Sequence, residues 1–175
     1  MPRSESELEG AKRCLIRLLR YRPRSSFEVE RHLRQRGYSS RSIEEVLAWA
    51  EQAGLLDDQA FARLWIADRL ARRPTGRALL ERELREKGIS AQIIEEALAR
   101  AELDEEALAR QLANERWARY RHLSEEECRV RVFNFLRRRG FSSRTSSKVV
   151  EELTAGREAE ARTEAPPVRG SSRSG

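Results

Sequence analysis

One short segment occurs three times and decides the fold: Leu33-Arg-Gln-Arg-Gly37-Tyr38-Ser39, Leu84-Arg-Glu-Lys-Gly88-Ile89-Ser90 and Leu136-Arg-Arg-Arg-Gly140-Phe141-Ser142. Its glycines are 51 and 52 residues apart, and such regular self-similarity is the signature of a tandem repeat. The match continues after the first two glycines as Ile43-Glu-Glu-Val-Leu47 and Ile94-Glu-Glu-Ala-Leu98. After the third glycine it weakens to Ser146-Ser-Lys-Val-Val150.

The repeated segment carries the residues that end one α-helix and begin the next. A glycine just past a helix adopts the left-handed conformation without strain on a Cβ. In the Schellman motif the residue after that glycine contacts the apolar residue five positions earlier. The sequence therefore pairs Leu33 with Tyr38, Leu84 with Ile89, and Leu136 with Phe141. Basic residues fill the last helical turn, at the negative end of the helix dipole. The N-caps predicted for the next helices are Ser39, Ser90 and Ser142.

Other signals mark the remaining helix boundaries. Asp57 and Asp104 are predicted N-caps, Pro74 and Arg22-Pro23 end helices, and Ser25 with Glu28 and Ser124 with Glu127 are predicted capping boxes. Together they predict nine helices, near 6–21, 26–36, 40–52, 58–72, 76–87, 91–101, 105–120, 125–139 and 143–153. No run alternates with period two, so we predict no strand.

These elements predict an all-α fold of three tandem three-helix repeats, without a β-sheet, stacked into an elongated, curved array. The expected organisation is a flexible segment over 1–10, repeats over 11–53, 54–102 and 103–153, and a disordered tail over 154–175. Ser146 stands where an apolar residue would oppose Phe141, so we expect the last helix to pack most loosely.

Composition excludes several classes of protein. Apolar stretches of only a few residues fall far short of the ~20 that cross a bilayer, so we expect no membrane association. The polar first ten residues do not resemble a signal peptide, and with only two distant cysteines, Cys14 and Cys128, we expect a cytoplasmic protein. Two histidines 90 residues apart predict no metal site, and no catalytic or phosphate-binding motif occurs. We therefore expect neither a cofactor nor an enzyme.

The basic residues suggest a nucleic-acid partner. The chain has 35 Lys and Arg against 29 Asp and Glu, and only Lys12, Lys87 and Lys148 are lysines. The first repeat is the most basic, with a net charge of +5. Arginine clusters could form a track for a phosphate backbone, or they could be helix caps and solvated faces with partners four residues away. The candidate binding residues are Arg31, Arg34, Arg36, Arg72, Arg73, Arg77, Arg137, Arg138, Arg139 and Arg144.

The combination of motifs resembles the RecX family of RecA regulators. The resemblance rests on the three repeated helix ends, on Gly54-Leu-Leu-Asp-Asp-Gln-Ala-Phe-Ala62, on Arg22-Pro-Arg-Ser25 and on Arg137-Arg-Arg-Gly-Phe-Ser142, in the family's order. It implies a cytoplasmic bacterial protein that binds the RecA–DNA filament. The implied role is regulation, mostly inhibition, of RecA strand exchange, ATPase and co-protease activity in DNA repair and the SOS response.

The residues themselves leave two alternatives open: a helical protein that binds single- or double-stranded DNA without RecA, and a protein–protein adaptor whose arginines only confer solubility. The resemblance transfers no catalytic residue. In each case we expect a monomer.

Overall fold

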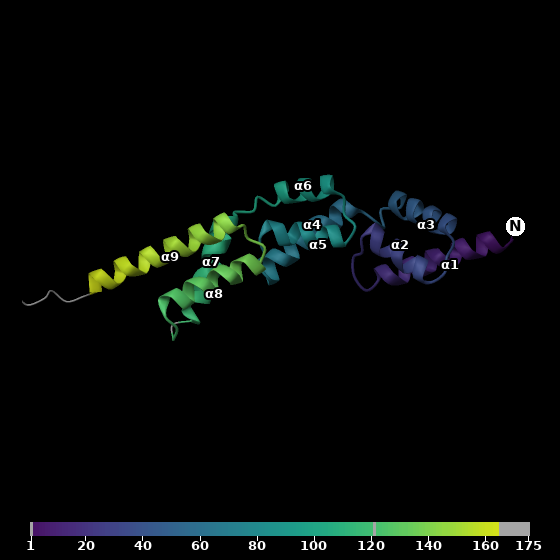
Figure 1. Ribbon diagram of the computed structural model, residues 1–175. Helices are drawn as coiled ribbons and strands as arrows, with labels where there is room; N and C mark the ends of the chain where they lie inside the picture. Colours follow the sequence, from purple (N-terminus) through teal and green to yellow (C-terminus); the bar gives the residue numbers. More distant parts are fainter. Residues whose placement is uncertain (1, 121, 165–175) are drawn as a thin grey trace, which may run out of the picture. The chain divides into compact units, whose positions relative to one another are not determined.

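The computed structural model describes residues 2–120 and 122–164 and contains, within them, nine α-helices and no β-strand (Figure 1). The helices are α1 (Pro2–Leu19), α2 (Ser26–Gln35), α3 (Ser40–Gln52), α4 (Asp58–Arg72), α5 (Arg77–Glu86), α6 (Ala91–Arg100), α7 (Glu105–Ala118), α8 (Glu125–Arg138) and α9 (Ser143–Glu164). A first compact unit with α1–α6 ends at Leu103, and a second with α7–α9 begins at Asp104. The predicted all-α fold of three-helix repeats is confirmed.

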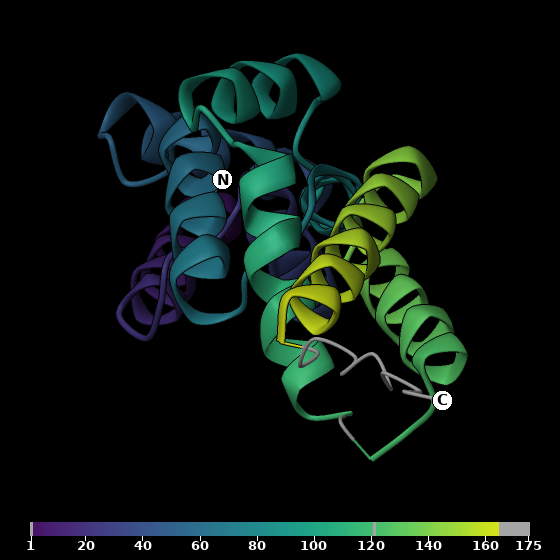
Figure 2. The ribbon, with the colours of Figure 1, turned by 90° about the vertical axis from the view of Figure 1, so that its left-hand side faces the viewer.

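Each repeat has a hydrophobic core of its own. Leu15, Val29, Leu33 and Val46 are fully buried in the first repeat, and Ala62, Leu80 and Leu84 in the second. In the third repeat α9 lies beside α7 and α8 (Figure 2). Its fully buried core residues are Ala109, Ala113, Val132, Leu136 and Phe141. The chain therefore folds as tight three-helix bundles, each closed by its own apolar stripes.

The three predicted glycine turns have the expected geometry. Gly37, Gly88 and Gly140 adopt φ of 83°, 76° and 87°. In each turn the N–H of the residue after the glycine donates to the carbonyl five residues earlier, at 3.3, 3.1 and 3.2 Å in chain order. The side chains of the three leucines that supply these carbonyls are completely buried. The turn thus ends the middle helix of a repeat and directs the next residue back to the core.

The predicted N-caps also form. Ser39, Ser90 and Ser142 each accept a hydrogen bond from the backbone N–H three residues later, and Asp57 and Asp104 do the same. Ser124 and Glu127 form the complete capping box. Helix boundaries agree with the sequence prediction to within one or two residues at most ends, because these caps are local.

The capping box predicted for Ser25 and Glu28 is wrong in one half. The N–H of Glu28 donates to Ser25 Oγ at 3.2 Å, as in a capping box. The Glu28 carboxylate, however, accepts hydrogen bonds from Arg22 at 2.9 Å and from Lys87 at 2.7 Å. Its side chain is 6% exposed, so two nearby cations neutralise a buried charge.

Further polar contacts join the first repeat to the second around this carboxylate. Ser25 Oγ donates to the carbonyl of Lys87 at 2.6 Å, and the N–H of Ser26 donates to Asp58 Oδ1 at 2.8 Å. Phe27 lies directly against Gly88, where a side chain would overlap its Cβ and Cγ atoms. The glycine therefore serves both the turn and the contact between repeats.

Both ends of the described chain are more helical than the sequence predicted. Instead of a flexible segment, Pro2–Gly10 belongs to α1, because Glu7 accepts the N–H of Ser39 at 2.7 Å and Leu8 packs on the first core. Hydrogen bonds from the Ser39 backbone and side chain lower the pKa of Glu7. Instead of a tail from residue 154, α9 continues to Glu164. The rest of the predicted tail, 165–175, lies outside the described residues.

The first half of α9 packs well, contrary to the expectation of loose packing. Ser146 is completely buried, and Val149 and Val150 are 1% and 5% exposed. Phe141 is buried against this cluster without an apolar partner at 146, because Val149 and Val150 supply the contact area. No helix of the described part is long and apolar enough to cross a membrane.

Replacement of Gly88 by alanine should destabilise the protein more than the same change at Gly37. Both positions have positive φ, which costs an alanine roughly 1–2 kcal/mol. At Gly37 the added methyl group meets open space, whereas at Gly88 it overlaps Phe27, which adds about 1–3 kcal/mol of overpacking. Urea unfolding of Gly88→Ala and Gly37→Ala measures the difference, and equal losses would contradict the close contact.

The Glu28 ion pairs should make stability fall in acid. Burial raises the pKa of Glu28, but the hydrogen bonds and charges of Arg22 and Lys87 outweigh it and lower the pKa to about 2. Because the folded pKa lies below the unfolded value, the stabilisation is complete above about pH 4.5 and is lost as the pH falls toward 2.

Glu28→Gln should therefore lose about 2 kcal/mol at pH 7 and less at pH 3. The control Glu30→Gln removes an exposed pair with Arg34 and should cost less than about 0.5 kcal/mol. Urea midpoints at the two pH values provide the measurement, and a gap between wild type and Glu28→Gln that does not change with pH would refute the assignment.

Candidate nucleic-acid interface

A basic groove of about 250 Å³ lies in the first repeat between the end of α1 and α2. α1 contributes side chains spaced three or four residues apart, and α2 contributes two spaced by four, so each helix presents one stripe to the groove. The lining residues are Cys14, Arg17, Leu18, Tyr21, His32 and Arg36. The burial of Leu15 and Leu33 beside these stripes fixes the orientation of both helices.

Tyr21 is the most exposed of the large hydrophobic side chains among the described residues, with 81% of its surface accessible. It lies two residues after the end of α1 at Leu19 and directly before Arg22-Pro23, outside the helix whose apolar face packs on the core. An exposed aromatic ring between cations is a stacking surface for a nucleobase. Together with Arg17 and Arg36 it places an exposed aromatic ring beside two exposed cations.

The positive charge of the groove comes from its arginines. Neither Arg17 nor Arg36 forms an ion pair or side-chain hydrogen bond with another described residue, and the groove lining contains no carboxylate. Burial lowers the pKa of His32, and the positive charges of Arg36 and Arg24 lower it further. The lowered pKa favours the neutral form of His32 at pH 7, so Arg17 and Arg36 supply the positive charge of the groove.

The three candidate arginines of α2 and its C-cap have different surroundings. Arg36 lines the groove. Arg34 is paired with Glu30 at 2.6 Å, and the guanidinium of Arg31 lies 5.8 Å from the centre of the Phe27 ring. The structure thus brings one of these three candidates into the groove.

In the second repeat the candidates around Pro74 are mostly neutralised within the chain. Arg72 pairs with Asp68 at 2.6 Å. Arg77 is paired with Glu81 at 2.8 Å and also with Glu95. Arg73 is exposed and has no ion pair within the described residues. The alternative of solvated, internally paired arginines therefore holds for Arg72 and Arg77.

The candidates of the third repeat surround the turn at Gly140. Arg137 donates to the carbonyl of Phe141 at 2.5 Å, and the guanidinium of Arg139 lies 5.1 Å from the centre of the Phe135 ring. Arg138 and Arg144 are exposed, and neither forms an ion pair with a described residue. Two of these four arginines thus have structural contacts within their own unit.

The sequence analysis did not select Arg17 or Tyr21 as binding residues. The available signal was an aromatic residue among Arg17, Arg20 and Arg22 at a helix end, with no apolar partner on its own face. Its exposure depends on where α1 ends, which the sequence placed at residue 21 and the structure places at Leu19.

Family models match all three repeats. The model described as the first three-helix domain of RecX matches residues 11–49, the second three-helix domain matches 57–98, and the third matches 104–150. Each model is thus met in its own repeat and in the family's order.

Curated relatives and solved structures agree with these matches. The chain is 38% identical over 161 residues to regulatory protein RecX of Mycobacterium leprae, which covers 90% of this chain and 94% of the relative. It is 36% identical over 138 residues to regulatory protein RecX of Pelodictyon phaeoclathratiforme, covering 79% and 85%. The crystal structure of RecX from Lactobacillus salivarius superposes with a TM-score of 0.76 at 23% identity, covering 86% of this chain and 99% of that one, a likeness of fold. With three domain matches and relatives aligned over most of their length, the chain belongs to the RecX family.

Proposed function

We propose that this protein is a RecX-type regulator that binds the RecA–DNA filament and inhibits RecA. Its curated relatives are named regulatory proteins, and the family resemblance implies RecA as the target. The observation that carries the proposal is the groove of the first repeat, where Arg17 and Arg36 have no partner in the described chain beside the exposed ring of Tyr21. Such a surface suits a single strand of DNA.

The proposed mechanism divides the work between two kinds of contact. The basic groove binds phosphates and stacks a base, while other faces of the repeats contact RecA subunits. Simultaneous contacts raise the effective concentration of each one, so weak individual contacts add to firm binding. A protein held across neighbouring subunits would block strand exchange or filament growth. We expect the regulator itself to need no cofactor and to act in the cytoplasm.

Substoichiometric protein should therefore reduce ATP hydrolysis by RecA on single-stranded DNA and shorten the filaments. One bound molecule affects many subunits if it blocks growth or bridges neighbours. A coupled ATPase assay with matched electron microscopy of filaments measures both effects. Unchanged hydrolysis and unchanged filament length would reject the proposal. Equal affinity for bare DNA and for the filament would favour the DNA-binding alternative, and partner binding unaffected by DNA would favour the adaptor.

The groove arginines can be tested against arginines that the chain itself neutralises. Arg17→Ala/Arg36→Ala should weaken binding to a labelled single-stranded oligonucleotide, and the slope of log K against log salt should become less negative by about 1.4, since each lost phosphate contact contributes roughly 0.7. The control Arg34→Ala/Arg72→Ala changes the net charge equally but removes paired residues.

Fluorescence anisotropy over a salt series gives both quantities. Equal losses for the two double variants would mean that general charge, and not the groove, binds the DNA. Tyr21→Ala should add a loss that varies little with salt, because stacking on a base releases no counterion.

A further inference from the structure

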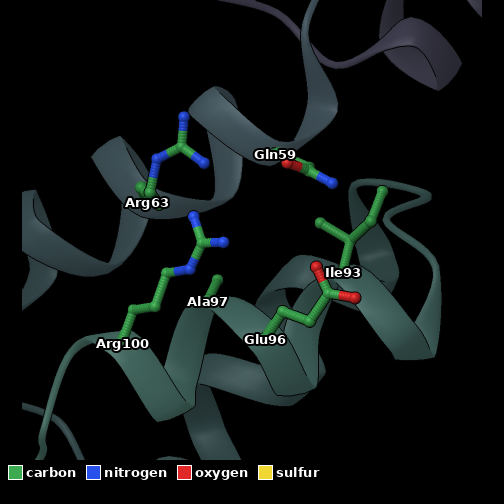
Figure 3. Close-up of a pocket in the computed structure, with 6 residues that line it drawn as sticks. All are labelled: Gln59, Arg63, Ile93, Glu96, Ala97 and Arg100. Atoms are coloured by element: carbon green, nitrogen blue, oxygen red, sulfur yellow. The ribbon is translucent and has the colours of Figure 1, made fainter.

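The second repeat has a groove between α4 and α6 whose charged side chains differ from those on the corresponding face of the other repeats. Two adjoining hollows follow it, one beside Gln59 and Ile93 and one of about 280 Å³ beside Leu70 and Ala101. Arg63 of α4, Ala97 and Arg100 of α6 line both hollows. Figure 3 shows Arg100 extending from α6 toward α4, next to Arg63.

These two arginines are not neutralised by an ion pair within the described residues. Neither forms an ion pair or side-chain hydrogen bond with a described residue. Glu96 lines the same hollow but accepts a hydrogen bond from Gln92 at 3.0 Å and is not paired with either arginine. Two like charges therefore face each other across a groove, an arrangement that an anion would stabilise.

The repeat register allows a direct comparison with the other two repeats. Ala11, Ala62 and Ala109 are completely buried at equivalent places in the first helix of each repeat. The residue after this alanine is Lys12, Arg63 or Arg110. The residue opposite it on the third helix is Trp49, Arg100 or Glu152, in chain order. These three residues are 51 and 52 positions apart, as the glycines are.

In the first and third repeats this cation contacts a partner side chain within the same repeat. In the first repeat Lys12 Nζ lies 5.1 Å from the centre of the Trp49 ring, a cation–π contact. In the third repeat Arg110 pairs with Glu152 at 3.1 Å. Only the second of the three repeats, within the described residues, places a second arginine at this position.

A second cross-helix ion pair, one helical turn earlier along the groove, is also present in the third repeat and, among the described residues, missing from the second. In the third repeat Glu106 of α7 pairs with Lys148 of α9 at 2.6 Å. The equivalent residues of the second repeat are Gln59 and Glu96, which form no such pair. Two cross-helix ion pairs thus neutralise charges along the face of the third repeat, which also has a hollow of about 290 Å³ beside Arg110 and Glu152, whereas the arginines of the equivalent hollow in the second repeat have no such partner among the described residues.

The walls of the open groove indicate what it binds. Ile66, Ala67 and Leu70 of α4 and Ala97 and Ala101 of α6 flank the two arginines. A DNA backbone offers only deoxyribose carbons between its phosphates, whereas an amphipathic helix has whole apolar side chains beside carboxylates. α4 and α6 run in the same direction along the groove, since Gln59 lies near Ile93 and Leu70 near Ala101, so a partner helix laid along the groove would contact both helices.

We propose that the α4–α6 groove binds an acidic amphipathic helix of a protein partner, with its carboxylates between Arg63 and Arg100. The inference rests on the proposed function, in which that partner is a RecA subunit of the filament. It assigns protein recognition to the second repeat and leaves DNA recognition to the groove of the first.

The test uses substitutions that the chain already contains at the equivalent position. Arg100→Glu reproduces the ion pair of the third repeat, and Arg100→Trp reproduces the cation–π contact of the first. Both should fold and keep the thermal midpoint of the wild type, because each supplies Arg63 with an internal partner. The matched controls are Arg82→Glu and Arg82→Trp, which alter an exposed arginine of α5 in the same repeat.

Binding of the full chain is measured by anisotropy to two probes, a bare oligo-dT strand and a RecA filament on that strand with a non-hydrolysable ATP analogue. Arg100→Glu and Arg100→Trp should weaken filament binding at least about tenfold relative to the Arg82 controls, since they occupy the site of an interfacial ion pair. On bare oligo-dT they should match those controls.

Three other outcomes would each overturn the inference, and each would have a different meaning. Equal weakening on both probes, beyond that of the controls, would make the groove a phosphate site. Filament binding equal to that of the controls would leave the groove without a role in RecA recognition. A wild type that binds the filament no better than the bare strand would remove the proposed function itself, and this inference with it.

Discussion

Each repeat depends on a left-handed glycine that ends its middle helix. At Gly37, Gly88 and Gly140 the backbone takes a conformation that other residues adopt only with strain, and the next residue returns to the core beside a buried leucine. The turn sets the angle between the second and third helices of a repeat, so it determines which faces meet in the core. The apolar stripes, the serine caps and the groove walls all follow from that angle.

The sequence predicted most of the fold because helix ends are encoded locally. A glycine, an apolar residue and a serine in succession are enough to predict a turn between two helices. With the other local caps and prolines, they allowed the positions of nine helices to be predicted from the sequence. The Glu28 carboxylate shows where such reading stops. Its spacing from Ser25 fits a capping box, but Lys87 lies 59 residues away and offers a stronger partner. Contacts of this kind depend on the packing of two repeats, which no local pattern records.

The candidate site was harder to predict for a similar reason. Ten arginines were selected by clustering in the sequence, yet clustering does not tell a free guanidinium from a neutralised one. Arg34, Arg72 and Arg77 have carboxylate partners, and Arg137 caps a carbonyl. Arg36 lines the basic groove. Arg17 and Tyr21 line it too, but their positions there depend on where α1 ends, which the sequence did not predict correctly. The partners of Arg34, Arg72 and Arg77 that lie four residues away could have been foreseen, whereas the contact of Arg77 with Glu95 on another helix could not.

The contacts that join the first two repeats are of a different kind from those that hold each repeat together. Each core consists of closely packed apolar side chains, whereas the joint at Ser25, Glu28 and Lys87 consists of short, directional hydrogen bonds around one buried charge. Bonds of this type fix an orientation more than they add cohesion. The joint therefore fixes the distance and the orientation between the first and second repeats. The grooves of these two repeats stay at a constant separation, while each bundle keeps its own core.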